Sequence, residues 1–173
     1  PYIVGRPLAL VRCPTGITGE HFFQKHAWKG LDPHIALVKD PKEPAAEPLI
    51  SINDLDGLMA LVQAATLEIH PWGSTVGDWE RPDMIIMDLD PGDGVSWQTV
   101  IDAARETRRR LNDAGLAAFV KTSGGKGLHV VSPLVPKAEW PAVKAFTKAI
   151  ADAMAADHPD RFVATTTKAK RHG

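Results

Sequence analysis

The feature that most constrains this chain is an apolar run that ends in two aspartates and a tight turn. Met84 to Met87 are all apolar, Asp88-Leu89-Asp90 follow, and Pro91-Gly92-Asp93-Gly94 form a turn signal. Such a run before turn-forming residues predicts a strand buried on both faces. Because side chains alternate along a strand, Asp88 and Asp90 are predicted to point to the same side at its carboxyl end.

Two neighbouring carboxylates indicate either a bound cation or a structural use for one of them. Like charges this close repel, and they share a proton unless a cation is bound between them. Hard oxygen ligands suit Mg²⁺ or Mn²⁺, so the sequence predicts a metal site at Asp88 and Asp90. The structural alternative is that one aspartate caps the following turn or helix. Asp93 and Ser96 are better placed for that role.

Size and composition limit what this pair of carboxylates can belong to. The 173 residues, 44% of them hydrophobic, are enough for one core, so we expect a single domain over residues 1–173. The net charge of −1 gives no indication for or against nucleic acid. The only cysteine, Cys13, excludes an internal disulfide, and no apolar run reaches the roughly 20 residues that span a bilayer. We therefore expect a soluble cytoplasmic protein with no membrane partner.

Hydrophobic periodicity predicts strands interleaved with three helices. Strands are expected at residues 6–12, 49–52, 66–70, 117–121 and 128–131. The first helix is expected to be capped by Asn53 and to bury Leu55, Leu58, Met59 and Val62. The other two are expected from Ser96 to about Ala114, with Gly115 as the stop signal, and from about Glu139 to Ala155. Four arginines of the second helix are expected to face solvent: Arg105, Arg108, Arg109 and Arg110.

Two segments before the aspartates combine aromatic and ionisable side chains. Phe22 and Phe23 are adjacent, and Lys25 follows two residues later. Neighbouring side chains on a strand face opposite ways, so one ring can be buried while the other offers a stacking surface to a base. Burial of both rings in the core is an equally good interpretation. His70 ends a predicted strand, and its structural and functional interpretations are also balanced.

A glycine-rich loop separates the last two predicted strands. In Ser123-Gly124-Gly125-Lys126-Gly127 the glycines let backbone N–H groups approach a phosphate, and Lys126 supplies positive charge. The spacing differs from that of the Walker loop, and such a turn alone is a weak indication of phosphate binding. His129 lies two residues further on, where it could reach the same phosphates.

Four motifs, in this order and spacing, resemble the polymerase domain of bacterial DNA ligase D, which belongs to the archaeo-eukaryotic primase superfamily. They are Phe22-Phe23-Gln24-Lys25-His26, Glu68-Ile69-His70-Pro71-Trp72, Asp88-Leu89-Asp90-Pro91-Gly92 and Ser123-Gly124-Gly125-Lys126-Gly127-Leu128-His129. The resemblance runs from Arg6 to Arg171. It implies an α/β (α+β) fold with a central mixed, largely antiparallel sheet flanked by helices, as in the primase catalytic core.

The resemblance also implies roles for individual residues. Asp88 and Asp90 would hold two catalytic Mn²⁺ or Mg²⁺ ions, and His70 would lie at the active site near the incoming nucleotide. The triphosphate would be bound from the glycine loop and the following strand, by Ser123, Gly124, Lys126, Gly127 and His129. The DNA template or overhang would be contacted by Phe22, Phe23 and Lys25.

The implied activity is template-directed addition of NTPs or dNTPs to DNA ends during bacterial non-homologous end joining, by a two-metal mechanism. Expected partners are DNA ends with a 5′-phosphate, the Ku end-binding protein and an attached ligase domain, in the cytoplasm at the nucleoid. Three alternatives are open. One is a non-catalytic module that binds nucleotides or DNA ends. Another is a D-x-D phosphatase, which is disfavoured because about half the chain precedes the aspartates. The last is a D-x-D glycosyltransferase, which is disfavoured further because nothing in the sequence suggests a sugar-nucleotide fold.

Two departures from the family pattern concern the ends of the chain. The family places a third metal-binding aspartate after a Lys-x-Lys-Arg-x-Gly stretch, which here is Lys168 to Gly173. Its pocket for the 5′-phosphate draws on residues that would precede Pro1. We therefore expect a polymerase domain trimmed at both ends, which binds a metal–nucleotide complex weakly and extends primers little or not at all.

Overall fold

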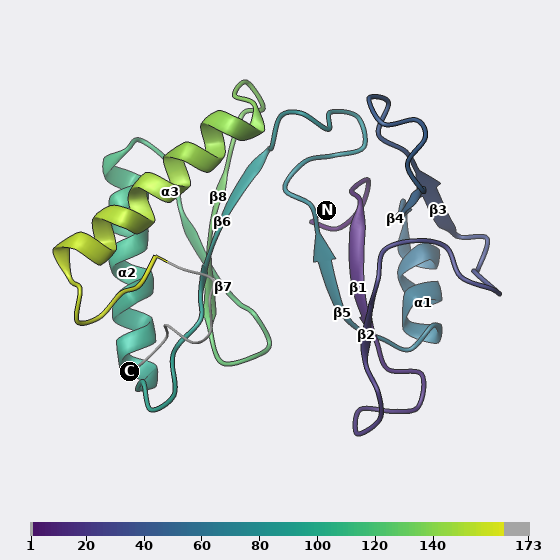
Figure 1. Cartoon of the computed structure of the whole chain (residues 1–173), viewed down its shortest axis with the longest axis horizontal. Helices are drawn as coiled ribbons and strands as arrows, with labels where there is room; N and C mark the ends of the chain where they lie inside the picture. The colour runs from purple at the N-terminus through teal and green to yellow at the C-terminus, as the bar shows by residue number, and fades with distance from the viewer. Residues whose placement is uncertain (1, 165–173) are drawn as a thin grey trace. The chain divides into compact units, whose positions relative to one another are not determined.

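Two antiparallel sheets account for the strands that the structure describes; one helix packs on the first sheet and two helices pack on the second (Figure 1). The computed structural model describes residues 2–164 and divides between Glu80 and Arg81 into two units, each with its own sheet. The α+β class expected from the sequence is confirmed. The described strands fall into two sheets where one central sheet was expected, and a single domain over residues 1–173 stays a prediction.

The first unit combines a five-stranded sheet with one helix. Its strands are β1 (Leu8–Arg12), β2 (Phe22–Gln24), β3 (Ile35–Val38), β4 (Leu49–Ile52) and β5 (Thr66–Pro71), and its helix is α1 (Leu55–Gln63). The strand order is β2-β1-β4-β3, and β5 also pairs with β1. The core lies between the sheet and α1 and contains Leu8, Leu10, Ile35, Ile50, Ile52, Ala60 and Leu61.

Helix α1 begins one residue later than the sequence predicted. Asp54, and not Asn53, is the N-cap, and its side chain accepts a hydrogen bond of 2.9 Å from the backbone N–H of Gly57. Both residue types are good caps, so the choice between them depends on which one has extended backbone, as Asp54 does.

The face of α1 that is buried also differs from the expected one. Three of the residues expected in the core, Leu55, Met59 and Val62, are 68%, 49% and 56% exposed, and the buried residues are Gly57, Ala60 and Leu61. Gly57 explains the difference. A Cβ atom there would lie 2.8 Å from Cβ of Ile52 and 3.0 Å from the carbonyl oxygen of His34, so only glycine allows this close approach.

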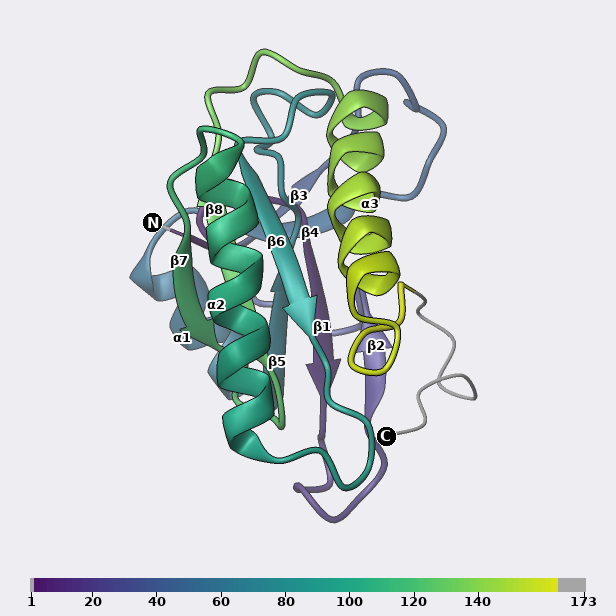
Figure 2. The ribbon, with the colours of Figure 1, turned by 90° about the vertical axis from the view of Figure 1, so that its left-hand side faces the viewer.

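The second unit combines a three-stranded sheet with two helices. Its strands are β6 (Met84–Leu89), β7 (Phe119–Thr122) and β8 (Leu128–Pro133), in the order β6-β8-β7, and its helices are α2 (Trp97–Asp113) and α3 (Trp140–Asp157). Figures 1 and 2 show both helices on the same face of this sheet. The core beneath them contains Val100, Ala104, Leu111, Ala118, Leu128 and Val130, and Phe146 and Ile150 of α3 pack against it.

The limits of α2 agree with the sequence prediction. Ser96 is the N-cap, and its Oγ accepts a hydrogen bond of 3.2 Å from the N–H of Thr99. Gly115, directly after the C-cap Ala114, has a φ of +82°, which favours glycine. Among residues 2–164, no helix is both long enough and apolar enough to cross a bilayer.

Strand β6 is buried on one face only, so the prediction of burial on both faces is wrong. Ile85 is 3% exposed, whereas its neighbour Ile86 is 37% exposed. The physical reason is that α2 and α3 cover only the face that bears Ile85, Met87 and Leu89. The other face bears Ile86 and Asp88.

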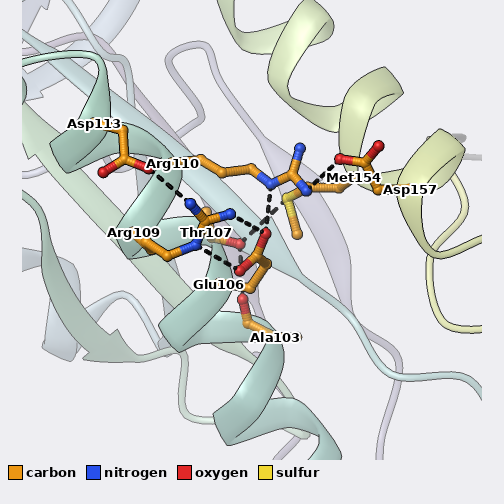
Figure 3. A network of polar contacts seen from close by, with 8 residues as sticks. All are labelled: Ala103, Glu106, Thr107, Arg109, Arg110, Asp113, Met154 and Asp157. Carbon is orange, nitrogen blue, oxygen red and sulfur yellow. Dashed lines mark hydrogen bonds and ion pairs between the residues drawn. The ribbon is translucent and has the colours of Figure 1, made fainter.

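The arginines of α2 do not all face solvent, and Figure 3 shows the contacts that two of them, Arg109 and Arg110, make. Arg110 is only 15% exposed and bridges Glu106 of its own helix and Asp157 of α3, with N···O distances of 2.7 Å to each. Arg109 is 58% exposed and joins Glu106 to Asp113. The expectation of a solvated face is therefore wrong for Arg110, which ties the two helices together.

Candidate active site

The second sheet bears a row of three ionisable side chains on the face that its helices leave uncovered. Asp88 of β6 is paired in register with His129 of β8, and His129 is paired with Lys121 of β7. Residues directly opposite one another on neighbouring strands project from the same face. The sequence placed Asp88 and His129 in separate motifs, and the antiparallel register of β6 and β8 brings them together.

Asp88 and His129 are in direct contact. Nε2 of His129 lies 3.4 Å from Oδ1 of Asp88, and the two side chains are 22% and 55% exposed, respectively. Nδ1 of His129 is buried and has no hydrogen-bond partner among the described residues. Nε2 is therefore the atom through which His129 can act on a ligand beside the carboxylate.

Gly127 allows the glycine loop to lie close to Asp90, the second of the two aspartates. A Cβ atom at this position would collide with the backbone carbonyl oxygen of Leu89 and would lie 3.5 Å from Oδ1 of Asp90. Only glycine therefore lets the start of β8 approach the end of β6 this closely. The sequence indicated that the glycines leave room for a phosphate, and it did not reveal this packing role.

Ser123 has a structural role inside the loop. Its Oγ donates a hydrogen bond of 3.1 Å to the carbonyl of Gly127 and accepts one of 3.3 Å from the N–H of Gly125. Gly124 has a φ of +87°, and Lys126 is exposed. The hydroxyl of Ser123 thus stabilises the loop through hydrogen bonds to the loop's own backbone. Its contact with a nucleotide stays a prediction.

A cavity of about 650 Å³ opens at the end of β6, inside the second unit. Its walls are the turn from Asp88 to Ser96, the first turns of α2, and residues 159–163, which follow α3. Its size suits a ligand of a few tens of heavy atoms. Carboxylates outnumber cations along its wall, since Arg161 lies among Asp88, Asp90, Asp93 and Asp160. Such a wall favours a ligand that brings its own cations, such as a metal–nucleotide complex.

Asp88 and Asp90 are the residues that fit a metal ion. Mg²⁺ is usually held by one or two carboxylates, with substrate phosphates and waters as the remaining ligands, and a pair at the end of a strand provides that donor set. Within residues 2–164 no group of three histidine, cysteine, aspartate or glutamate side chains could hold a metal. The stretch from Lys168 to Gly173 lies outside the described residues.

His70 and Phe23 lie side by side in the first unit, on the sheet face opposite to α1. Their ring centroids are 5.8 Å apart, and Nε2 of His70 lies 2.8 Å from Oε2 of Glu68. Glu68 was not predicted as a site residue, although its place two residues before His70 puts it on the same face of β5.

Phe22 lies on the opposite face from Phe23, where β1 pairs it with Arg12. Phe22 and Phe23 are 44% and 68% exposed, which excludes burial of both rings in the core. Lys25 is also exposed. Each of the two units therefore gathers its own set of predicted residues: His70 and the aromatic motif in the first, and the aspartates, the glycine loop and His129 in the second.

Comparisons with known proteins identify relatives of the whole chain. A family model described as "LigD, primase-polymerase domain" matches residues 1–173. The multifunctional non-homologous end joining protein LigD of Pseudomonas aeruginosa is 39% identical over 168 residues, which is 97% of this chain and 20% of that protein. Its counterpart in Mycolicibacterium smegmatis is 31% identical over 100% of this chain and 23% of its own length. The chain thus spans about a fifth of these curated relatives.

A solved structure shares the fold. The polymerase domain from Mycobacterium tuberculosis ligase D, in complex with DNA, matches with a TM-score of 0.85 at 28% identity, over 99% of this chain and 63% of that one. The α+β arrangement described above is therefore that of a ligase D polymerase domain.

Proposed function

We propose, from the premise that this chain belongs to the LigD primase-polymerase domain family, that it forms part of a catalytic domain for template-directed addition of nucleotides to DNA ends in non-homologous end joining. One observation carries the proposal. The β6–β8 register places Asp88 against His129, beside a glycine loop that packs on Asp90. Nucleotidyl transfer needs carboxylates for a metal next to a cradle for phosphates, and this sheet edge offers both.

Asp88 and Asp90 would hold Mn²⁺ or Mg²⁺, as two ions in the full reaction. Held by these carboxylates, such an ion would lower the pKa of the primer 3′-hydroxyl and would stabilise the negative charge that develops on the transferred phosphate. The protein contributes orientation. The rigid strand β6 fixes the direction of the carboxylates, so that they need no rearrangement when the substrate binds.

The triphosphate would be held from the glycine loop and β8. Nε2 of His129 can make a hydrogen bond to a phosphate oxygen, and the ammonium groups of Lys121 and Lys126 supply positive charge on the side of the loop. The backbone N–H groups of Gly124 and Gly125 can approach an oxygen closely because no Cβ is present. Ser123 would act by holding the loop closed through its bond to Gly127.

The aromatic motif of the first unit would bind nucleic acid. Phe23 presents an exposed ring beside His70, which suits stacking on a base, and Lys25 adds positive charge nearby in the sequence. We propose that His70 contacts the nucleotide or the strand that it joins. The structural relative was solved with DNA, which supports a DNA partner for this chain. Ku, an attached ligase domain and a nucleoid location belong to the same proposal.

A non-catalytic binding module is the second candidate. Its support is that the described residues provide two carboxylates at the site and no third ligand. Such a module would bind a metal–nucleotide complex and DNA ends without joining them.

The test compares binding and chemistry in the same preparation. Nucleotide binding is measured by titration with and without Mn²⁺, and nucleotide addition is measured on a DNA end with a recessed 5′-phosphate, using the natural protein that contains this chain. We expect Asp88→Asn to abolish Mn²⁺-dependent binding and addition, with the melting temperature unchanged or raised, because one of two like charges is removed. The matched control is Asp102→Asn, an exposed carboxylate of α2 that pairs with Arg105.

Three outcomes decide between the candidates. Addition that requires both Mn²⁺ and Asp88 supports the polymerase. Binding without any addition supports the non-catalytic module. Nucleotide binding that neither Mn²⁺ nor the substitution affects contradicts both.

A further inference from the structure

Arg12, at the end of β1, holds its guanidinium group against two aromatic rings. The Cζ atom lies 4.1 Å from the ring centroid of Trp28 and 5.9 Å from that of Phe22. Aromatic faces attract a guanidinium and restrict its orientation. This side chain was not among the residues singled out from the sequence.

A hydrogen bond fixes one edge of the guanidinium and leaves the other edge open. Nε donates to the carbonyl oxygen of Ala64, the C-cap residue of α1, at 2.8 Å. The two terminal nitrogens make no hydrogen bond to any of residues 2–164, and neither is buried without a partner, so both reach solvent. Four N–H donors therefore remain in a fixed fork, the geometry that binds a phosphate or carboxylate with two parallel bonds.

The charge of Arg12 has no counter-ion among the described residues. No carboxylate lies within ion-pair distance of it, in contrast to Arg105, Arg109 and Arg110. Burial lowers the pKa of Arg12, and no neighbouring carboxylate opposes that effect. A partly buried cation with open donors and no partner is stabilised by an anion that binds from solvent.

We propose that Arg12 is a phosphate subsite for DNA, with the exposed ring of Phe22 beside it as the surface for the adjoining sugar or base. This inference rests on the proposed function, because it assumes that the first unit binds DNA. Phe22 is 44% exposed next to the guanidinium, so a phosphodiester can meet both a charge and a ring. A free anion would use only the charge.

The competing explanation is purely structural. In that case Arg12 stabilises the C-terminus of α1 through Ala64 and packs between the rings, without touching a ligand. Salt dependence separates the two explanations, because each phosphate that a protein neutralises adds about 0.7 to 0.9 to the slope of log K against log salt concentration.

The experiment is a DNA-binding titration by fluorescence anisotropy over a series of salt concentrations, with a DNA end that carries a single-stranded overhang. We expect Arg12→Gln to weaken binding about threefold to tenfold and to reduce the slope by about 0.7 to 0.9. Arg12→Lys keeps the charge and should keep the slope while it weakens binding. The matched control is Arg108→Gln, an exposed arginine of α2 with no partner among the described residues, which should change neither quantity.

Four results overturn the proposal. They are an unchanged slope in Arg12→Gln, an equal loss of slope in Arg108→Gln, an equal loss of affinity for a free nucleoside triphosphate, and loss of binding only in proportion to unfolded protein. If the unsubstituted chain does not bind DNA at all, the proposed function itself fails, which is a different outcome from an unchanged slope.

A second measurement does not depend on whether the Arg12→Gln variant folds. The Nε–H resonance of Arg12 can be assigned by its disappearance in Arg12→Lys. We expect this resonance to shift when the DNA end is added and to stay in place with the same concentration of nucleoside triphosphate. A resonance that DNA does not move overturns the subsite.

Discussion

At the residue scale, the site depends on two contacts that single side chains determine. Asp88 faces His129 across β6 and β8, and Gly127 leaves room for the end of β6. The motifs were visible in the sequence, because aspartates after an apolar run and glycines beside a histidine stand out. The antiparallel register that pairs them, and the collision that any side chain at Gly127 would cause, depend on three-dimensional packing and could not be inferred from the motifs alone.

Gly127→Ala tests that packing. The new Cβ would collide with the backbone of Leu89, so we expect a loss of about 2 kcal/mol or more in the free energy of unfolding, and a loss of Mn²⁺-dependent nucleotide binding. Gly77→Ala is the control, since this residue lies outside the glycine loop and its Cβ would meet only Oγ1 of Thr75 at 3.8 Å. Denaturant titration and nucleotide titration of both variants provide the comparison. Equal effects at the two positions would contradict a special role for Gly127.

His129→Ala tests the proposed contact with the triphosphate. We expect nucleotide binding to weaken by about 1–3 kcal/mol, the usual effect of losing a charge-assisted hydrogen bond, while DNA binding hardly changes. Val131→Ala, on the same face of β8, controls for the loss of side-chain volume. The measurement is the dissociation constant of each ligand. A parallel loss of both affinities would instead indicate a structural role for His129.

At the element scale, capping signals were more informative than hydrophobic stripes. Ser96 and Gly115 gave the limits of α2 correctly. For α1 the sequence offers two overlapping apolar stripes, and the close approach at Gly57 decides which one is buried. Strand β3 was not predicted, although its four consecutive apolar residues are the same kind of signal that predicted β6. Arg110 was expected in solvent. Its partner Asp157 is 47 residues away in the sequence, so no local pattern indicates the ion pair.

The contact between α2 and α3 predicts a pH dependence of stability. Hydrogen bonds from Arg109 and Arg110 lower the pKa of Glu106 from 4.5 to about 2. Since the pKa is lower in the folded state, the stabilisation is fully present above about pH 4.5 and is lost as the pH falls toward 2.

Glu106→Gln should therefore make the free energy of unfolding depend less on pH in the acid range. As the pH falls through that range, we expect the free energy of unfolding of the unsubstituted chain to decrease by about 1–2 kcal/mol more than that of the variant. This value takes into account that solvent screens the partly exposed ion pairs. Denaturant titration at a series of pH values measures the difference. Glu20→Gln, at an exposed residue whose side chain makes no hydrogen bond or ion pair among the described residues, should leave the curve unchanged. Parallel curves for the chain and Glu106→Gln would contradict the prediction.

At the scale of the whole molecule, each unit is expected to respond to its own ligand. The carboxylates, the glycine loop and His129 lie in the second unit, whereas Phe22, Phe23 and Arg12 lie in the first. Hydrogen exchange read by mass spectrometry can test this division. Nucleotide with Mn²⁺ should protect peptides that cover residues 84–94 and 121–131, and a DNA overhang should protect those that cover residues 8–12 and 20–28. DNA-induced protection confined to the second unit would contradict the assignment of the aromatic motif.

The bridge from Arg110 to Asp157 has a consequence for a surface that neither residue touches. Asp157 is the last residue of α3, and residues 159–163, which begin two positions later, form one wall of the cavity beside the aspartates. Dissolved salt weakens the attraction between partly exposed charges. The ion pair between Arg110 and Asp157 therefore holds the end of α3, and the segment after it, less firmly as ionic strength rises. We therefore expect the shape of the cavity to depend on ionic strength through this ion pair, apart from any effect of salt on the charges of the proposed nucleotide.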